Sequence, residues 1–240
     1  KKTPREKMKY LSDLFKEVYF KDIEDRYNVA MPEVLQVLTD DLCSSVGSLT
    51  NSLKIANTLK SVRNINVNSQ TISTYLTYLE ESFLFNEAKR FDVKGKKYFS
   101  YPSKYYCTDM GLRNARLNFR QQEETHAMEN IIYNELLSRG YSVDVGVVQY
   151  TSKGTDGKQH QIQCEIDFVV NDGMNKYYIQ SALNIDDANK EKTELRPLTA
   201  TRDFFKKVIV TKTRMKPWLD DSGIIHAGLY DFLLDESCLK

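Results

Sequence analysis

The feature that most restricts the fold is a pair of strand-like segments in the second half of the chain, the first of which carries two acids. Segments 163–170 and 176–182 are rich in β-branched and aromatic residues. Between them, residues 171–175 have the composition of a hairpin turn, because Asp-Gly tolerates positive φ. The alternation of side chains along a strand predicts that Glu165 and Asp167 point to the same face. A metal-dependent phosphodiester site can be built on such an acidic strand.

The composition is that of an ordinary globular protein. The 240 residues are enough for one large domain or two of ordinary size, and we expect two. No apolar run approaches the roughly 18 residues of a membrane span, and no signal peptide opens the chain, so we expect a cytoplasmic protein without a membrane partner. The formal net charge is +1, so any nucleic-acid binding must come from local basic patches.

The cysteines and histidines do not predict a structural metal site. Cys43, Cys107, Cys164 and Cys238 are widely spaced and form no CxxC pair. The chain has 3 histidines to add to them. We therefore expect reduced and mostly buried thiols.

The first half of the chain is predicted to contain helices followed by a β-hairpin. Apolar residues recur at helical spacing in four segments: 5–27, 32–45, 52–59 and a helix that starts at Ser69 or Thr71 and ends at Ser82. A strand over 83–91, a basic turn and a returning strand over 98–101 follow. Three short helices and a β-hairpin form the arrangement of a winged helix, which we expect over 31–115 after a linker helix over 1–30.

In a winged helix the third helix enters the major groove, and its early polar residues lie nearest the bases. The wing meets phosphate. The helix has no Lys or Arg and ends in Glu80 and Glu81, so a packing or protein-contact role for this domain stays open. The candidate base contacts are Asn68, Ser69, Gln70, Ser73 and Thr74, and the candidate phosphate contacts are Lys94, Lys96 and Lys97.

The second half is predicted to be a mixed α/β domain over 116–240, after a polar connector at 116–125. Its order is a helix, a hairpin-rich sheet, and then a helix and a strand. The predicted elements are a helix at 127–139, strands at 142–150, 163–170 and 176–182, a turn region at 152–159, a helix at 187–202 interrupted at Pro197, and a strand at 204–211. Neither GxxxxGK[ST] nor GxGxxG occurs, so no nucleotide is expected to bind by those routes.

Several of these segments resemble one family. Residues 104–114, Glu165-Ile166-Asp167-Phe168 and Tyr178-Ile179-Gln180 are similar to the C-terminal half of a group of bacterial and archaeal AAA-type ATPases. In that group a P-loop ATPase module is followed by a winged helix and a domain of unknown function. The resemblance implies an ATPase module upstream, which alone would bind ATP, in line with the missing initiator Met. It also implies a restriction-endonuclease-like PD-(D/E)XK fold for the last domain.

The resemblance places a nuclease centre on particular residues of this chain. Glu129 matches the helix acid, Asp167 matches the strand acid, and the (D/E)XK triplet falls on Gln180-Ser181-Ala182. An active centre would hold Mg²⁺ with Glu129, Glu165 and Asp167 and would use a lysine to activate water. Gln180 contributes no charge to a hard-cation site, and Ala182 cannot replace a lysine.

The sequence leaves three functions open. We expect a DNA-binding or assembly module that has lost cleavage and adjoins an ATPase domain. One alternative is an active Mg²⁺-dependent DNA endonuclease that uses Glu129, Glu165, Asp167 and Gln180, with a lysine that has migrated to Lys176, Lys190 or Lys192. The other is a protein–protein interaction module without nucleic acid.

Overall fold

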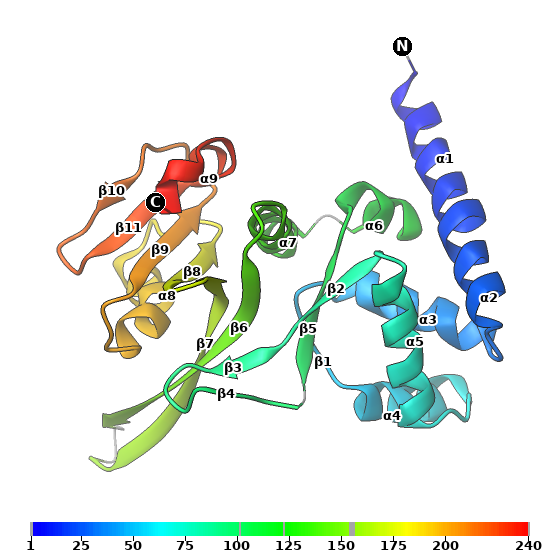
Figure 1. Cartoon of the computed structure of the whole chain (residues 1–240), viewed down its shortest axis with the longest axis horizontal. Coiled ribbons are helices and arrows are strands. Elements are labelled where there is room, and N and C mark those ends of the chain that lie inside the picture. The colour runs from blue at the N-terminus through cyan, green and yellow to red at the C-terminus, as the bar shows by residue number, and fades with distance from the viewer. Residues whose placement is uncertain (1, 101, 122, 154–156, 240) are drawn as a thin grey trace. The chain divides into compact units, whose positions relative to one another are not determined.

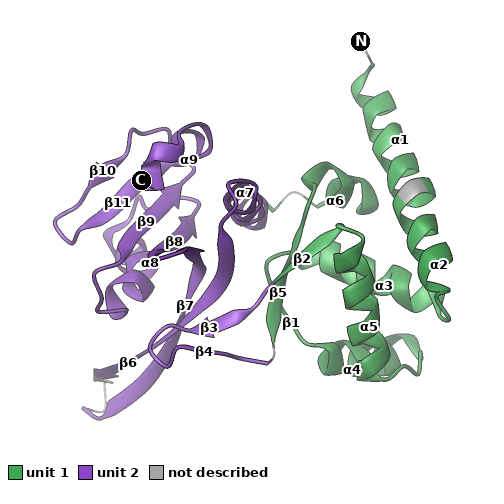
Figure 2. Cartoon of the chain, in the orientation of Figure 1, with its two compact units in different colours: residues 1–87, 101–123 green, residues 88–100, 124–240 purple. Residues whose placement is uncertain are grey.

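The computed structural model (Figure 1) describes residues 2–100, 102–121, 123–153 and 157–239, without the side chains of Val18 and Lys153. The chain forms two compact units (Figure 2): unit 1 contains 1–87 and 101–123, and unit 2 contains 88–100 and 124–240. Helices and a large mixed sheet are both present, which confirms the expected combination of helices with a mixed sheet (α+β or α/β). In the described part of the chain, no helix combines the length and apolar character needed to cross a membrane.

Unit 1 is mainly helical, and its predicted helices are present. Side-chain caps fix several helix starts: Asn51 accepts from the N–H groups of Leu53 and Lys54, and Asn68 accepts from that of Thr71. The segment expected as one helix over 5–27 has a π-helical turn in its middle. The helical elements are α1 (Pro4–Leu14), η1 (Phe15–Phe20), α2 (Lys21–Tyr27), α3 (Pro32–Ser44), α4 (Ser52–Arg63), α5 (Ser69–Glu81) and α6 (Met110–Arg116).

A small sheet completes unit 1. Its strands are β1 (Leu49–Thr50), β2 (Phe85–Ala88) and β5 (Ser103–Cys107), in the order β1-β5-β2. An apolar cluster fills the space among these elements, with Leu38, Ile72 and Leu79 completely buried. The segment 103–114, expected as a strand end and a turn, contains a strand and a helix instead, because Asp109 accepts from the N–H of Leu112 and caps α6.

Unit 2 is built around an 8-stranded sheet with the order β10-β11-β9-β8-β7-β6-β3-β4. Strands β6, β7 and β8 form an antiparallel meander, and β9 runs parallel to β8. The strands are β3 (Arg90–Asp92), β4 (Lys97–Tyr98), β6 (Ser142–Lys153), β7 (Gln159–Asp172), β8 (Asn175–Ala182), β9 (Lys206–Thr211), β10 (Trp218–Leu219) and β11 (Ile224–Gly228).

The helices of unit 2 follow the predicted order. They are α7 (Glu124–Ser138), α8 (Ala188–Ala200), α9 (Leu229–Leu234) and the 3₁₀-helix η2 (Glu236–Leu239). A parallel neighbour requires a crossover, and α8 provides the one between β8 and β9. The turn predicted over 152–159 lies partly outside the described residues, which omit 154–156.

The predicted wing does not belong to the helical unit. Residues 88–100 group with unit 2, because β3 pairs in parallel with β6 in the register Arg90 to Val145. Val93 is buried in the apolar cluster of unit 2. The grouping therefore differs from the predicted domains 31–115 and 116–240. Alternation along the chain predicts a strand but not the partner with which it pairs.

Pro197 does not interrupt α8. The helix continues to Ala200 with Pro197 inside it. Proline removes one helical hydrogen bond and crowds the preceding turn. Pro197 and Leu198 are both buried, and this burial offsets part of that cost. Leu195 and Leu198 pack against the sheet in a cluster with Ile166, Val169 and Ile209.

Candidate functional site

Two of the predicted catalytic residues, Asp167 and Gln180, lie where β7 and β8 separate. Pairing of these strands runs from Asp172–Asn175 to Phe168–Ile179. The opposite neighbour of β7 shows a register shift, since Gly146 pairs with Ile166 but Asp144 pairs with Val169. One extra residue of β7 therefore forms a bulge. Ile166 and Val169, three apart, pack in the same cluster, so the alternation along β7 is broken between these two residues, in the stretch that contains Asp167.

Asp167 and the start of the (D/E)XK-like triplet are hydrogen bonded to each other. The N–H of Ser181 donates to Oδ2 of Asp167 at 2.8 Å. The N–H of Asp167 donates to Oε1 of Gln180 at 3.4 Å. Glu129, Asp167 and Gln180 are each only 8% exposed. These contacts bridge the two strands beyond their last backbone pair, so they hold the fork between β7 and β8.

Glu194 is a member of this site that sequence reasoning missed. It lies on α8, and its Oε2 accepts from Nε2 of Gln180 at 3.5 Å. Leu198, four residues later, is completely buried against the sheet. Residues at i and i+4 share a helix face, so the helical period could have placed Glu194 over β8. We define the Gln180 cluster as Asp167, Gln180, Ser181 and Glu194.

Ala182, at the position of the expected lysine, belongs to the apolar cluster beneath α8. It is 3% exposed and lies with Val148, Tyr178 and Leu198. The lysines that could have replaced it have other surroundings. Lys190 donates to Asn184, Lys176 lies over the rings of Phe91 and Phe205, and Lys192 is exposed.

The residues predicted to hold Mg²⁺ do not form a recognisable metal centre. Glu129 is on α7, while Glu165 and Asp167 are on β7 on either side of Ile166, near the bulge. Among the described residues, no group of three or more His, Cys, Asp or Glu side chains is placed to hold a metal ion. The donor set therefore does not fit the ion that the resemblance implies, and the catalytic roles of these residues stay predictions.

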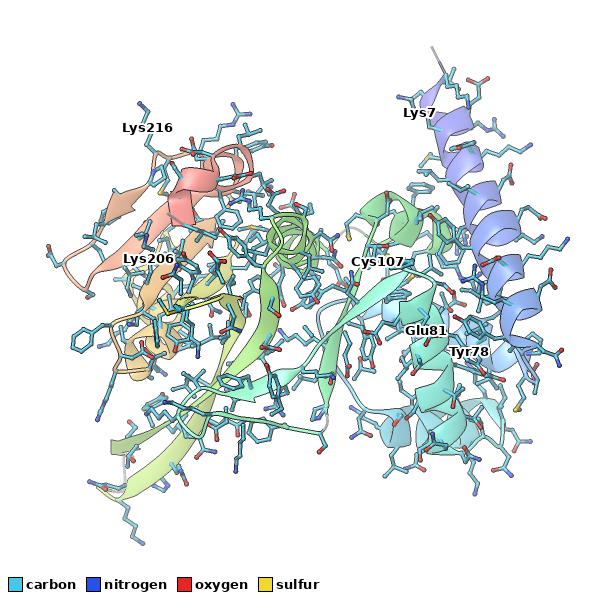
Figure 3. The ribbon with its side chains drawn as sticks, viewed as in Figure 1. Lys7, Tyr78, Glu81, Cys107, Lys206 and Lys216 are labelled. Atoms are coloured by element: carbon cyan, nitrogen blue, oxygen red, sulfur yellow. The ribbon has the colours of Figure 1, made fainter. Side chains whose placement is uncertain are left out.

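The candidate base-reading residues lie on α5 in unit 1. Gln70 is exposed, and Ser73 and Thr74 are half-buried. Gln70 and Thr74 line a small cavity of about 260 Å³ beside Tyr27 and Tyr78. Tyr27 stacks on Tyr78 with 4.0 Å between ring centroids, and its hydroxyl donates to Glu81, which projects from α5 with Tyr78 (Figure 3). The end of α2 thus borders the polar start of α5.

The candidate phosphate-binding lysines lie in unit 2. Asp92 shapes their turn, because its Oδ1 accepts from the N–H groups of Lys94 and Gly95. Nζ of Lys94 donates to the carbonyl oxygen of Gln149 at 2.6 Å, and Lys94, Lys96 and Lys97 are all exposed. The two sets of predicted DNA contacts are therefore carried by different units.

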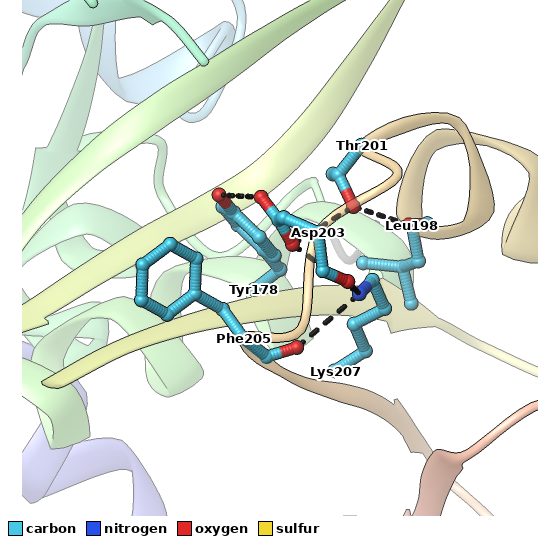
Figure 4. Close-up of polar contacts among 6 residues, drawn as sticks. All are labelled: Tyr178, Leu198, Thr201, Asp203, Phe205 and Lys207. Atoms are coloured by element: carbon cyan, nitrogen blue, oxygen red, sulfur yellow. Dashed lines mark hydrogen bonds and ion pairs between the residues drawn. The ribbon is translucent and has the colours of Figure 1, made fainter. Parts of the chain in front are cut away.

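A second polar cluster, also not predicted, fixes the segment after α8 (Figure 4). Oδ2 of Asp203 accepts from the Tyr178 hydroxyl at 2.7 Å, and Oδ1 accepts from Thr201 at 3.2 Å and from Lys207 at 3.3 Å. Burial, together with the bond to Asp203, raises the pKa of the Tyr178 phenol. We call Tyr178, Thr201, Asp203 and Lys207 the Asp203 cluster. These hydrogen bonds join members of the cluster to one another, and they anchor the loop between α8 and β9.

Comparison with known proteins shows one family. A relative, an uncharacterized protein of Haemophilus influenzae, is 36% identical over 201 residues, and the match covers 84% of this chain and 46% of the relative. The chain thus spans about half the length of this curated relative. The crystal structure of protein VC1899 from Vibrio cholerae has 12% identity, covers 84% of this chain and 53% of that chain, and has a TM-score of 0.29, too low to support an argument about fold.

These similarities contain no link to AAA-type ATPases, so that part of the resemblance stays a proposal. The family model that matches is described as a domain of unknown function, DUF8612, and it matches residues 1–123. That match covers just over half of the 240 residues. The chain therefore belongs to the DUF8612 family.

Proposed function

We propose that the chain is a nucleic-acid-binding and assembly module of a larger protein, built on a nuclease-like sheet that no longer cleaves. In this proposal the larger protein carries the AAA-type ATPase module that the sequence resemblance implies. The order α7-β6-β7-β8-α8-β9 agrees with the helix, hairpin-rich sheet, helix and strand expected for the nuclease-like domain. The greater length of the Haemophilus influenzae relative is consistent with an additional module.

The observation that carries this proposal is that Gln180 is hydrogen bonded as a neutral amide. Its amide presents Oε1 to the N–H of Asp167 and Nε2 to the carboxylate of Glu194. A glutamate at this position would have no hydrogen to donate to Glu194 and would place a third carboxylate beside Asp167 and Glu194. The surroundings thus suit a neutral amide rather than an acid that binds a cation.

The packing of Ala182 supports the same conclusion. The ammonium that would stabilise developing charge during phosphodiester cleavage is replaced by a methyl group in an apolar cluster. Ile166, Ile209 and Leu198 belong to the same cluster. Burying a lysine there would be costly without a compensating partner. We therefore assign the sheet a scaffold role and derive no chemical step from it.

The test of lost cleavage is a nicking assay. The purified chain is incubated with supercoiled plasmid in Mg²⁺ and, separately, in Mn²⁺. We expect the same rate of nicking for the wild type and for Asp167→Ala, both at background. Nicking by the wild type that is abolished in Asp167→Ala would show an active nuclease and would overturn this part of the proposal.

The test of binding uses a labelled DNA duplex and fluorescence anisotropy at several salt concentrations. Changing Lys94, Lys96 and Lys97 together to Ala removes three positive charges, and we expect the log–log salt slope to fall by up to about 3. The matched control changes Lys7, Lys9 and Lys16 of the N-terminal helical segment to Ala, which alters the net charge equally. If both triple variants bind like the wild type, the hairpin takes no part in binding.

A further inference from the structure

An aromatic and basic strip lies on unit 2, beyond the end of α8. Nζ of Lys176 is 5.1 Å from the ring centroid of Phe91 and 5.4 Å from that of Phe205, so the ammonium lies between the two rings. Phe91 also contacts Tyr98, with 5.2 Å between centroids. The strip therefore joins β4, β3, β8 and the loop before β9. We define it as Phe91, Tyr98, Lys176, Phe204 and Phe205.

Much of the aromatic surface of this strip is open to solvent. Phe204 is fully exposed, Phe205 is 42% exposed and Tyr98 is 57% exposed. Met174, in the turn before Lys176, is also fully exposed. Scattered exposed apolar residues are ordinary, but a contiguous group of large ones indicates a contact surface.

The loop that carries the two phenylalanines is anchored rather than loosely attached. Asp203, directly before Phe204, is bonded to Tyr178, Thr201 and Lys207. Lys207 also donates to the carbonyl oxygens of Asp203 and Phe205. The ring of Phe205 meets Tyr178 edge-on (Figure 4). This anchoring lowers the conformational entropy that a bound ligand would otherwise have to remove.

The charges around the strip favour an anionic ligand. Lys89 and Arg202 are exposed and lie two residues before Phe91 and Phe204 in the sequence. Lys89 and Lys176 both lie close enough to Asp144 to act on its carboxyl group. Asp144 itself accepts from the hydroxyl of Tyr98 at 2.9 Å, and burial raises its pKa. Asp203 is paired with Lys207. Asp144 and Asp203 are thus engaged, while cations accompany the exposed rings.

We propose that this strip binds single-stranded nucleic acid, with bases stacking on Phe204 and Phe205 and phosphates meeting Lys176 and Arg202. Aromatic rings next to cations are the features that recognise unpaired strands, because an unpaired base exposes its flat face. In a duplex the neighbouring base pairs cover those faces. The inference rests on the proposed function, since it names the strand type and the surface by which the module would bind.

The experiment compares a labelled oligothymidine of about 20 nucleotides, long enough for one such binding surface, with a duplex of equal length. Affinities are measured by fluorescence anisotropy with the whole chain. We expect Phe204→Ala to weaken oligothymidine binding by about tenfold and to leave duplex binding within about twofold. Since the Phe204 ring is fully exposed, its removal leaves the melting temperature unchanged. Leu234→Ala, which removes another exposed apolar side chain of unit 2, is the matched control.

Other results would overturn the inference in distinguishable ways. If the wild type binds both probes and the double variant Phe204→Ala/Phe205→Ala binds them equally well, the strip is not the binding surface and the proposed function stands. If the wild type binds neither probe at low salt, both proposals fail. If the double variant retains binding but loses self-association in size-exclusion chromatography, the occupant is a second copy of the chain rather than a nucleic acid.

Discussion

The Gln180 cluster and the Asp203 cluster both lie beside α8, but they differ in how firmly they are bonded. In the Gln180 cluster the side-chain amide makes contacts of 3.4 and 3.5 Å, at the long limit for hydrogen bonds. In the Asp203 cluster the carboxylate and backbone carbonyl of Asp203 accept at 2.7 and 2.6 Å from Tyr178 and Lys207. The Gln180 amide is thus held less tightly than Asp203, to which the nuclease resemblance assigns no role.

The difference shows what each cluster can do. In the Asp203 cluster a carboxylate faces an ammonium, so the charges are balanced and the loop is fixed. In the Gln180 cluster an amide lies between the backbone N–H of Asp167 and the carboxylate of Glu194, and the methyl group of Ala182 follows two residues later. We infer that the first cluster stabilises the fold, and that the second retains the position of a reactive centre without its charges.

The largest expected effect comes from restoring the missing lysine. Ala182→Lys would bury an ammonium among Val148, Ile166 and Leu198, and we expect the free energy of unfolding to fall by about 3 to 5 kcal/mol. Desolvation would hold the pKa of this lysine below its unfolded value of about 10.4, so the loss should shrink as pH rises toward 10. Urea denaturation at pH 7 and pH 9.5 measures both effects.

The control for this substitution is Ala182→Met, which adds a side chain of similar length without a charge. Overpacking alone should cost about 1 to 3 kcal/mol, with no dependence on pH. Equal losses for the lysine and methionine variants at pH 7 would mean that the lysine finds a charged partner or reaches solvent. The site would then be closer to a nuclease centre than its packing indicates.

A smaller effect is expected for Gln180→Glu. The new carboxylate would lie near Asp167 and Glu194, and we expect a loss of about 2 kcal/mol at pH 8 from repulsion and from the lost contact to Glu194. Repulsion would raise its folded pKa above the unfolded value of about 4.3, so folded protein would bind the extra proton and stability would recover as pH falls toward 5.

Adding Mg²⁺ to the Gln180→Glu variant tests whether the restored carboxylate can bind a divalent cation. Thermal unfolding of Gln180→Glu is measured with and without the ion, beside Gln161→Glu, an exposed glutamine on the same strand as Asp167. We expect Mg²⁺ to leave both melting temperatures unchanged. A selective rise for Gln180→Glu would show that the fork still accepts a divalent cation once its charge is restored, and the comparison between the clusters would then fail.

Local sequence patterns predict the elements well but not their long-range pairing. The helical period predicts a helix that begins at Ser69 or Thr71, and α5 spans Ser69–Glu81. Alternation likewise predicts β8, which covers Asn175–Ala182. The pairing of β3 with β6 could not be predicted, because those residues are more than 50 positions apart and no local signal specifies a parallel partner.

The site was predictable only in part, because local patterns again indicate which elements form but not how distant elements meet. Asp167 and Gln180 come together because a short hairpin joins their strands, and the turn at 171–175 already indicates this. The bulge between Ile166 and Val169, the stretch that contains Asp167, was not predictable from alternation, which assumes an uninterrupted ladder. The Asp203 cluster depends on where the loop after α8 meets β8, and that contact is set by packing of the whole unit.

The smallest expected loss of stability comes from a substitution in the Asp203 cluster. Tyr178→Phe removes the hydroxyl that donates to Asp203 but leaves the bonds of Thr201 and Lys207, and we expect a loss of about 1 to 2 kcal/mol near pH 7. Tyr230→Phe, at a residue that is 49% exposed, is the control and should change stability by less than about 0.5 kcal/mol.

The pH dependence of stability tests the hydrogen bond between Tyr178 and Asp203 directly. Burial and the contact with Asp203 raise the pKa of Tyr178 above its ordinary value of 10.0. Above pH 10 the unfolded chain loses this proton while the folded protein keeps it, so stability falls as pH rises. The wild type should therefore lose stability between pH 9.5 and 11 more steeply than Tyr178→Phe. Parallel curves for the two proteins would show that Asp203 does not hold the phenol in its protonated form, and the Asp203 cluster would then be no firmer than the Gln180 cluster.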